Sequence, residues 1–319
     1  MRLRRRAFLA GVASAGAIGR PARAADALRI AVISDLNGSY GSTEYSPEAA
    51  GAIARILELA PDLVICTGDM VAGQQASPKL TEPQLMAMWS AFHATVTDPL
   101  KAAGIPLLVT PGNHDASAYP GFELERKVFD TTWTKRAPEI EILDGERYPF
   151  RYAASFQGML LVGLDITTSG TQPVEETEWT AQILREQASR HRATIVFGHL
   201  PIWAVSKGRE SDVIGDQAFQ DMLVQGGASA YLSGHHHAYF PSRTGGLLQV
   251  SQARLGSGPR KYLGTDLTAI KAFGVIDIAA SGQIDEVAFA VPDFRSQIKL
   301  TSLPEALPSD RGKIRRRDR

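Results

Sequence analysis

Five short polar segments each follow a run of apolar residues, and this repeated arrangement constrains the fold more than any other feature of the chain. The apolar runs hold five or six residues rich in Val, Ile and Leu, which is typical of buried β-strands. Five of the seven histidines fall in the polar segments. The segments are Asp35-Leu36-Asn37, Gly68-Asp69, Gly112-Asn113-His114-Asp115, Gly198-His199 and Gly234-His235-His236-His237.

The first half of the chain alternates strands with helices. Strands are predicted over residues 28–33, 62–66 and 105–109, and each ends just before a polar segment. Helices are predicted from Ser46-Pro47 to residue 60 and over residues 81–103, because apolar side chains recur there at helical spacing. This order is typical of parallel strands joined by helical crossovers, whose ligand-binding side chains collect at the carboxyl ends of the strands.

The second half has a more mixed pattern. Strands over 193–197 and 228–232 precede the two histidine-containing segments, and no regular period is visible after residue 292. The other predicted elements are helices over 174–189 and 216–225, strands over 148–154 and 159–164, and antiparallel strands over 247–250, 273–278 and 286–291.

The polar segments supply the donors that a pair of divalent metal ions needs. Two metal ions neutralise the oxygens of a phosphoester and lower the pKa of a bound water, so that hydroxide forms at neutral pH. A carboxylate is suited to bridge them, while neutral imidazoles and amides keep the site from becoming too anionic for phosphate. Mixed nitrogen and oxygen donors favour manganese, iron or zinc over calcium or magnesium. The available donors are Asp35, Asp69, Asn113, His199, His235 and His237.

In this order and spacing, the segments resemble the D-x-[H/N], GD, GNHD, GH and GHxH signatures of the calcineurin-like metallophosphoesterase superfamily. The resemblance covers roughly residues 28–291. It implies an α+β fold of four layers, αββα, in which a mixed β-sandwich is flanked by helices and the metal site lies at the carboxyl ends of strands. It also implies a hydrolase that cleaves a small-molecule phosphomonoester or phosphodiester by attack of a metal-bound hydroxide.

The resemblance further implies a role for each matched residue. Asp69 would bridge the two divalent metal ions. His114 would stabilise the phosphoryl group or protonate the leaving alkoxide, and Asp115 would orient its imidazole. The remaining ligands would be Asp35, Asn37 and His237 for one ion, and Asn113, His199 and His235 for the other.

Asn37 departs from the family pattern, which usually has His at this position. An amide oxygen is a weaker donor than an imidazole, so the first ion is expected to be held loosely, to be a harder ion such as manganese, or to use Ser39, Tyr40 or Tyr45 instead. An alternative interpretation is a degenerate, catalytically weak protein that binds metal or phosphate on the same fold. Purple acid phosphatases are set aside because Ala72 replaces their Tyr.

Residues 1–24 resemble an export signal. They hold six Arg and no acidic residue, with a short apolar stretch before Ala22-Arg23-Ala24. Arg5-Arg6-x-Phe8-Leu9 resembles a bacterial twin-arginine signal, with an ordinary secretory signal as the alternative. The apolar stretch is too short for a stable membrane anchor. We therefore expect a periplasmic or secreted protein with a catalytic domain over 25–295 and a solvated, basic tail over 296–319.

Charge and loops limit the partners. The chain has 34 basic and 34 acidic residues, so removal of the six N-terminal arginines leaves a formal charge of −6, which does not favour nucleic acid. Substrate selectivity is assigned to loops 70–80, 116–122, 166–174 and 203–215. Their candidate contacts are Tyr119, Phe122, Trp203 and Arg209. His93, His191 and His236 are interpreted as non-ligands, and Cys66 as a buried apolar residue.

Overall fold

The computed structural model describes residues 27–309 and 312–319. The predicted export signal lies outside these residues. Among the described helices, none combines the length and the apolar character needed to cross a membrane.

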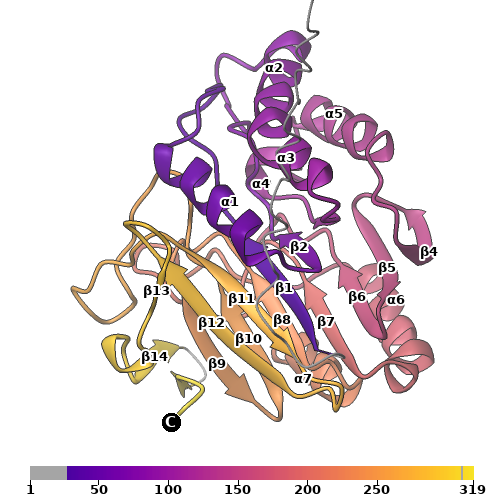
Figure 1. The fold of residues 1–319 in the computed structure, drawn as a ribbon, viewed down its shortest axis with the longest axis vertical. Coiled ribbons are helices and arrows are strands. Elements are labelled where there is room, and N and C mark those ends of the chain that lie inside the picture. Colours follow the sequence, from indigo (N-terminus) through magenta and orange to yellow (C-terminus); the bar gives the residue numbers. More distant parts are fainter. Residues whose placement is uncertain (1–26, 310–311) are drawn as a thin grey trace, which may run out of the picture.

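The first sheet joins the N-terminal strands to strands from the end of the chain (Figure 1). Its three N-terminal strands run parallel to one another, and β1 also pairs antiparallel with β11. In order across the sheet, the strands are β13 (Ser296–Gln297), β12 (Ile284–Ala290), β11 (Ala272–Ile278), β1 (Leu28–Ile33), β2 (Leu63–Cys66) and β3 (Leu107–Val109).

The second sheet has a parallel centre with antiparallel strands at both edges. β6, β7, β8 and β10 are parallel neighbours, whereas β4, β5 and β9 pair antiparallel. The order is β4 (Glu141–Arg147), β5 (Arg151–Phe156), β6 (Met159–Gly163), β7 (Ala193–Phe197), β8 (Ala230–Ser233), β10 (Leu247–Ser251) and β9 (Phe240–Thr244).

Helices cover the outer faces of both sheets. The helices of the first half, which lie together in the upper part of Figure 1, are α1 (Pro47–Leu59), α2 (Glu82–Phe92), a π-helix (His93–Thr97), α3 (Asp98–Ala102), α4 (Asn113–Ala116) and α5 (Glu123–Thr134). Those of the second half are α6 (Val174–Gln187), a 3-10 helix (Ala188–Arg190) and α7 (Gln217–Gln225).

The side chains of β1 show how the layers form. Leu28, Ile30 and Val32 point into the core between the two sheets, whereas Ala31 and Ile33 pack with the helices of the first half. A third apolar cluster joins the second sheet to α6 and α7. Strands buried on both faces read as continuous apolar runs, which is the pattern that the sequence shows. The predicted four-layer αββα fold is confirmed.

The local pairing differs from the prediction in one strand. The segment 247–250 was expected in an antiparallel arrangement, but β10 pairs antiparallel only with β9 and runs parallel to β8. After β8 the chain forms β9, which runs in the opposite direction, and then turns into β10. β10 therefore runs in the same direction as β8 and pairs with it.

The C-terminal segment is where the structure differs most from the sequence-based prediction. β14 (Ala306–Ser309) and β15 (Gly312–Arg315) form a hairpin after a 3-10 turn at Leu300–Ser302. Leu307 is buried in the inter-sheet core, and the backbone N–H of Arg317 donates to the Pro241 carbonyl at 2.9 Å. The expectation of a solvated tail is therefore wrong for the described part of this segment, because its alternate apolar residues complete the core.

Candidate metal centre

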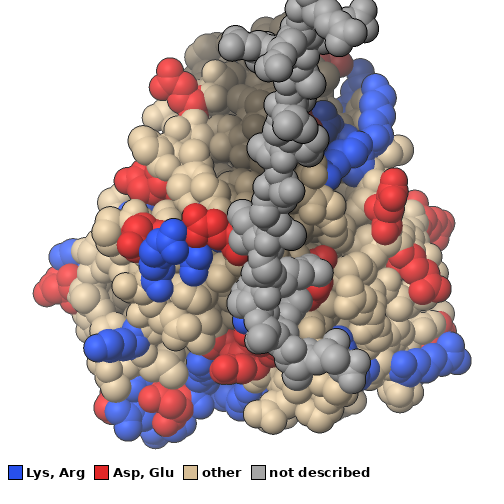
Figure 2. Space-filling view, viewed as in Figure 1, with Lys and Arg blue, Asp and Glu red and all other residues tan. Residues whose placement is uncertain are grey.

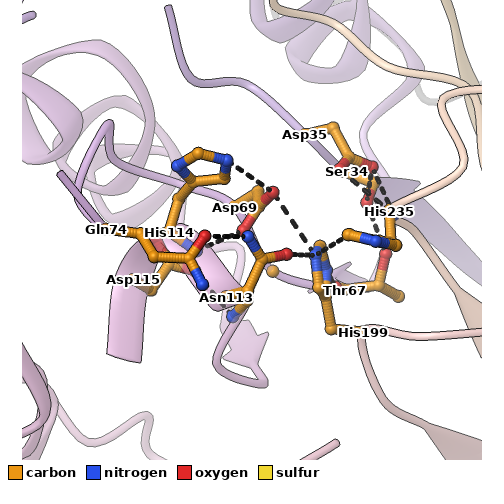
Figure 3. Close-up of polar contacts among 12 residues, drawn as sticks. Ser34, Asp35, Thr67, Asp69, Gln74, Asn113, His114, Asp115, His199 and His235 are labelled. Atoms are coloured by element: carbon orange, nitrogen blue, oxygen red, sulfur yellow. Dashed lines mark hydrogen bonds and ion pairs between the residues drawn. The ribbon is translucent and has the colours of Figure 1, made fainter. Parts of the chain in front are cut away.

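The five polar segments meet where strands of both sheets end. Asp35 and Asp69 follow β1 and β2, and α4 begins at Asn113 shortly after β3. From the second sheet, His199 follows β7, and His235 and His237 follow β8. Figure 3 shows most of these side chains converging on one small region. The fold therefore brings the polar segments together, as predicted from their positions at strand ends.

The Asp69 carboxylate occupies the middle of this region (Figure 3). Its Oδ2 lies 3.3 Å from Nε2 of His199 on one side and 4.0 Å from Nε2 of His114 on the other. Its Oδ1 accepts the backbone N–H of His114 at 2.9 Å. The residue is buried, and burial by itself raises the pKa of its carboxyl. The neighbouring His199 and His114 outweigh this effect and bring the pKa below its usual value, so the group is ionised.

One group of donors surrounds His199. Its Nε2 lies 3.0 Å from Oδ1 of Asn113 and 3.3 Å from Nδ1 of His235. Donor atoms of Asp69, His199 and His235 all lie within 4.8 Å of one another, as a metal site requires. The Nδ1 of His199 is 2.8 Å from the Thr67 carbonyl, so a proton on Nδ1 leaves the Nε2 lone pair facing the other donors.

A second group of donors is built on Asp35. Its Oδ1 lies 3.3 Å from Nε2 of His237, whose Nδ1 is 2.6 Å from the Gly258 carbonyl. Its Oδ2 accepts the Ser34 hydroxyl at 2.6 Å. Burial alone would raise the pKa of Asp35, but His237 and His199 bring it below its usual value. An ionised carboxylate and a fixed imidazole thus face each other, which suits a cation between them.

Asn37 lies beside this second group. The residue is buried, and its side-chain amide has no hydrogen bond within residues 27–309 and 312–319. Its backbone is fixed, since its N–H donates to the Asp69 carbonyl at 3.2 Å. Tyr45, one of the substitute ligands considered, is engaged elsewhere because its hydroxyl donates to the Met70 carbonyl at 2.7 Å. Asn37 is therefore the better candidate for the remaining position.

The backbone is strained at four of the candidate ligand positions. The φ angles of Asp35, Asp69, His235 and His237 are 52°, 54°, 62° and 56°, in the left-handed region that side chains other than glycine rarely adopt. Among the described residues, only eight non-glycine residues have a positive φ, and half of them are these four. Such strain persists where the surrounding structure imposes it, which is typical of functional sites.

Two glycines of the polar segments allow this crowding. A Cβ on Gly112 would lie 2.0 Å from the backbone nitrogen of Asp69, and one on Gly234 would lie 2.0 Å from the Ser34 hydroxyl. The segments could not approach each other with any larger residue at these positions.

The protonation of His199 also indicates a cation site. Burial lowers its pKa, but the carboxylates of Asp69 and Asp35 outweigh this effect and raise it to about 9. In the absence of metal, a proton on His199 compensates the buried negative charge. A divalent ion would take over that compensation, and the oxygen and nitrogen donors present match the preferences of such an ion. The residues therefore fit a metal centre.

His114 is placed differently from the other histidines. Its Nδ1 lies 2.9 Å from the Gly73 carbonyl, and its imidazole is 5.4 Å from the ring of Tyr40, centre to centre. Its side chain is 21% exposed. It therefore stands at the open side of the region, where it can reach a bound molecule.

Asp115 does not orient His114 as expected. Its Oδ1 accepts the backbone N–H groups of Met70 and Val71 at 2.8 and 2.9 Å, and its Oδ2 accepts that of Gly112 at 2.9 Å. The expected contact with the imidazole is therefore not formed, because both oxygens hold the loop after β2 against the one after β3. Burial, and then the charge of Asp69, raise the pKa of Asp115 to about 7.

A family model for calcineurin-like phosphoesterases matches residues 28–239 of this chain. The chain belongs to this family. It is accordingly a metal-dependent phosphoesterase, a hydrolase that acts on phosphoester bonds, and the donor cluster described above is where a divalent metal can bind. No curated protein matches the sequence.

Solved structures share the fold at low identity. A purple acid phosphatase from yellow lupin (Lupinus luteus) is 15% identical with a TM-score of 0.63 over 86% of this chain. This chain spans about half of the lupin protein, 52% of its length. A dimetal phosphatase from Danio rerio is 12% identical with a TM-score of 0.55, over 82% of this chain and 95% of that one. PhoD is 10% identical with a TM-score of 0.58, over 88% of this chain and 73% of its own.

Two residues that support the phosphoesterase site were not found from the sequence. Gln74 Oε1 accepts the amide N–H of Asn113 at 2.6 Å, which leaves the Asn113 carbonyl oxygen facing His199. Asp212 Oδ2 lies 3.7 Å from Nε2 of His235 and accepts a guanidinium N–H of Arg209 at 2.5 Å. Both are single residues in loops, and no local pattern marks them.

His236 is turned away from the other histidines. Its Nδ1 accepts the backbone N–H groups of Val205 and Ser206 at 3.0 and 3.1 Å, and its Nε2 lies 3.0 Å from the Asp212 carbonyl. Burial lowers its pKa to about 3, so it is neutral. Both ring nitrogens are occupied, and the residue holds the loop that carries Asp212.

Proposed function

We propose that this phosphoesterase hydrolyses a small-molecule phosphomonoester or phosphodiester with two divalent ions, manganese, iron or zinc, that share the Asp69 carboxylate. The observation that carries the proposal is the buried Asp69 carboxylate, whose donor atom lies within 4.8 Å of those of His199 and His235, while the backbone carbonyl of the same residue accepts the N–H of Asn37 from the other group. Asp35, Asn37 and His237 would hold one ion, and Asn113, His199 and His235 the other.

The ions, when bound, would neutralise the phosphoryl oxygens and supply hydroxide at neutral pH. The protein's own residues position the other participants. Thr67 and Gly258 fix the imidazoles of His199 and His237 through their carbonyls, so that each Nε2 faces the centre. His114 would give a proton from Nε2 to the leaving oxygen while the Gly73 carbonyl, 2.9 Å away, holds Nδ1.

The test is a substrate panel with defined metal content. Metal-free protein is reconstituted with manganese, zinc or iron and assayed on phosphomonoesters, phosphodiesters and nucleotides, with elemental analysis of each sample. Hydrolysis should appear only after reconstitution and should follow the amount of bound metal. Turnover that is independent of metal, or full metal binding with no turnover on any phosphoester, would contradict the proposal.

The charges on the face shown in Figure 2 are more consistent with a small-molecule substrate than with nucleic acid. On the face shown in Figure 2, Lys and Arg side chains are mixed with Asp and Glu, without a continuous basic area among the described residues. Binding of nucleic acid depends mainly on cationic contacts to phosphates.

We also propose export by the twin-arginine route, which rests on Arg5-Arg6-x-Phe8-Leu9. This route recognises the arginine pair, so replacing both Arg5 and Arg6 by Lys should leave the precursor in the cytoplasm. Cell fractionation with antibody detection measures the distribution. Export of the double variant at the wild-type level would remove this part of the proposal.

A further inference from the structure

The segment after β10 is bound to the residues proposed to hold the first metal ion. The backbone N–H of Gly256 donates to the Asp35 carbonyl at 2.7 Å, and that of Ser257 donates to the Asn37 carbonyl at 3.1 Å. The carbonyl of Gly258 lies against Nδ1 of His237 at 2.6 Å. Arg260 follows Gly258 by two residues, so its backbone lies near the residues of the metal centre.

A second loop is joined to this segment. The backbone N–H of Lys207 donates to the Lys261 carbonyl at 2.9 Å, and that of Leu263 donates to the Val205 carbonyl at 2.8 Å. The joined loop carries Arg209, which pairs with Asp212 beside His235. Two guanidinium groups, Arg209 and Arg260, thus come from neighbouring loops on the same side of the centre.

Among the residues that the structure describes, none forms an ion pair with Arg260. Within the described residues, its guanidinium forms no ion pair or hydrogen bond, and its Nε is buried without a partner. Burial, its largest influence, and the nearby Arg209 lower the pKa of Arg260, whereas Asp35 and Asp212 raise it. The hydrogen bonds of Gly256 to Asp35 and of Lys207 to Lys261 place the backbone on either side of Arg260 beside the centre and beside the loop of Arg209. A buried donor without an acceptor is costly unless a ligand supplies one.

Arg254 adds to this positive charge. The residue is buried, its Nε has no partner among the described residues, and one of its other nitrogens donates to the Ala269 carbonyl at 3.1 Å. Arg254 thus adds a third guanidinium group on the segment that follows β10; burial lowers its pKa, whereas the carboxylates of Asp35 and Glu48 raise it. Among the described residues, Arg209 forms its ion pair with Asp212. The arrangement suits an anion.

We propose that Arg260, with Arg209 beside it, forms an anion-binding subsite next to the metal centre, and that the substrate carries a second anionic group besides the phosphoryl group that is hydrolysed. The second group is a phosphate or a carboxylate, since a guanidinium binds either through paired N–H donors. This inference rests on the proposed function and specifies the class of substrate.

The test compares substrates that differ in the second anion. Release of inorganic phosphate is measured for glycerol 3-phosphate and 3-phosphoglycerate, and for fructose 6-phosphate and fructose 1,6-bisphosphate, so that the two pairs distinguish a carboxylate from a phosphate. Arg260→Gln should reduce kcat/KM on the preferred doubly anionic substrate by about tenfold to a hundredfold, mainly through KM, because one charge-assisted contact is lost. On the singly anionic substrate of the same pair, the reduction in kcat/KM caused by Arg260→Gln should be at least tenfold smaller.

Two further variants control for other effects of the substitution. Arg260→Lys should recover part of the loss, because it keeps the charge without the paired donors. Arg243→Gln removes an exposed guanidinium on β9 that donates to the Gly246 carbonyl, and both substrates of each pair should keep their wild-type rates. If Arg260→Gln reduced kcat/KM equally on both substrates of each pair, the proposal would be overturned, because the guanidinium would then act on the reacting phosphoryl group. Absence of any loss would overturn it as well.

A binding measurement separates this inference from the proposed activity. Calorimetry on the metal-loaded protein compares 3-phosphonopropionate with propylphosphonate, neither of which can be hydrolysed. The wild-type protein should bind the former about tenfold or more tightly, and Arg260→Gln should remove most of the difference while keeping the bound metal. Equal affinity of the wild-type protein for both ligands would overturn the subsite even if hydrolysis is observed. A preserved preference without hydrolysis would leave the subsite supported and the proposed activity wrong.

Discussion

At the residue scale, His114 differs from the other histidines of the metal centre in position and exposure. Its Nε2 lies 4.0 Å from Asp69, and its side chain is partly exposed, whereas that of His199 is fully buried. Its other nitrogen is held by the Gly73 carbonyl. We therefore expect this imidazole to act on the substrate and to contribute little to metal binding.

His114→Ala should keep the metal content of the wild-type protein and lose roughly 10²- to 10⁴-fold in kcat, the range for a lost general acid. The deficit should shrink on nitrophenyl phosphate, because nitrophenolate leaves without a proton. Elemental analysis and steady-state kinetics on alkyl and nitrophenyl esters measure both effects. Near-normal turnover of an alkyl phosphate would show that His114 has no catalytic role.

The sequence predicted which polar segments meet at the candidate site but not the residues that support them. The donors stand in short segments at strand ends, so predicting the strands was enough to bring Asp69 and His199 together. The partners of these donors come from distant loops, and Gln74 and Asp212 carry no local signal. Asp115 was misassigned for the same reason, since adjacency to His114 in sequence does not reveal which backbone N–H groups its carboxylate accepts.

At the element scale, the C-terminal hairpin is part of the folded core. Leu307 is fully buried against residues of the inter-sheet core, and Arg316 is buried with a guanidinium N–H donated to the Leu303 carbonyl. The strands were not predicted because each is only four residues long and holds few apolar residues. The exposed edge strand β4 and the proline-containing β9 escaped prediction for related reasons, since neither shows alternation along a buried face.

Leu307→Ala should lower the free energy of unfolding by about 2–5 kcal/mol, the cost of removing a buried leucine side chain. Leu267→Ala, at a leucine that is 44% exposed, is the matched control and should change it by less than about 1 kcal/mol. Urea denaturation followed by circular dichroism measures both. Equal, small effects of the two substitutions would mean that the hairpin does not contribute to the core.

At the scale of the whole molecule, Glu286 connects the two sheets and the C-terminal segment. It lies on β12, accepts the hydroxyl of Tyr239, which directly precedes β9 of the second sheet, at 2.9 Å, and lies 3.5 Å from a guanidinium nitrogen of Arg317. Its other carboxyl oxygen has no partner among the described residues. Burial, only partly opposed by Arg317 and Tyr239, raises its pKa from 4.5 to about 7.

This raised pKa makes stability depend on pH. The folded protein binds the Glu286 proton more tightly than the unfolded chain does, so stability is lost as the pH rises from about 4.5 through about 7. Relative to Glu286→Gln, which does not titrate, the free energy of unfolding of the wild-type protein should fall by about 3 kcal/mol between pH 4 and pH 8. Denaturation at several pH values measures the difference, and a constant difference would contradict the protonation assigned to Glu286.

The metal content of two variants shows whether Asp69 holds both ions. If Asp69 holds both ions, Asp69→Ala should lose most of both, whereas Asn113→Ala should weaken mainly one, because Asn113 belongs to a single group of donors. Each protein is dialysed against a limiting concentration of manganese or zinc and analysed for bound metal per chain. We expect about two ions for the wild-type protein, about one for Asn113→Ala and nearly none for Asp69→Ala. An unchanged metal content in Asp69→Ala would contradict this expectation.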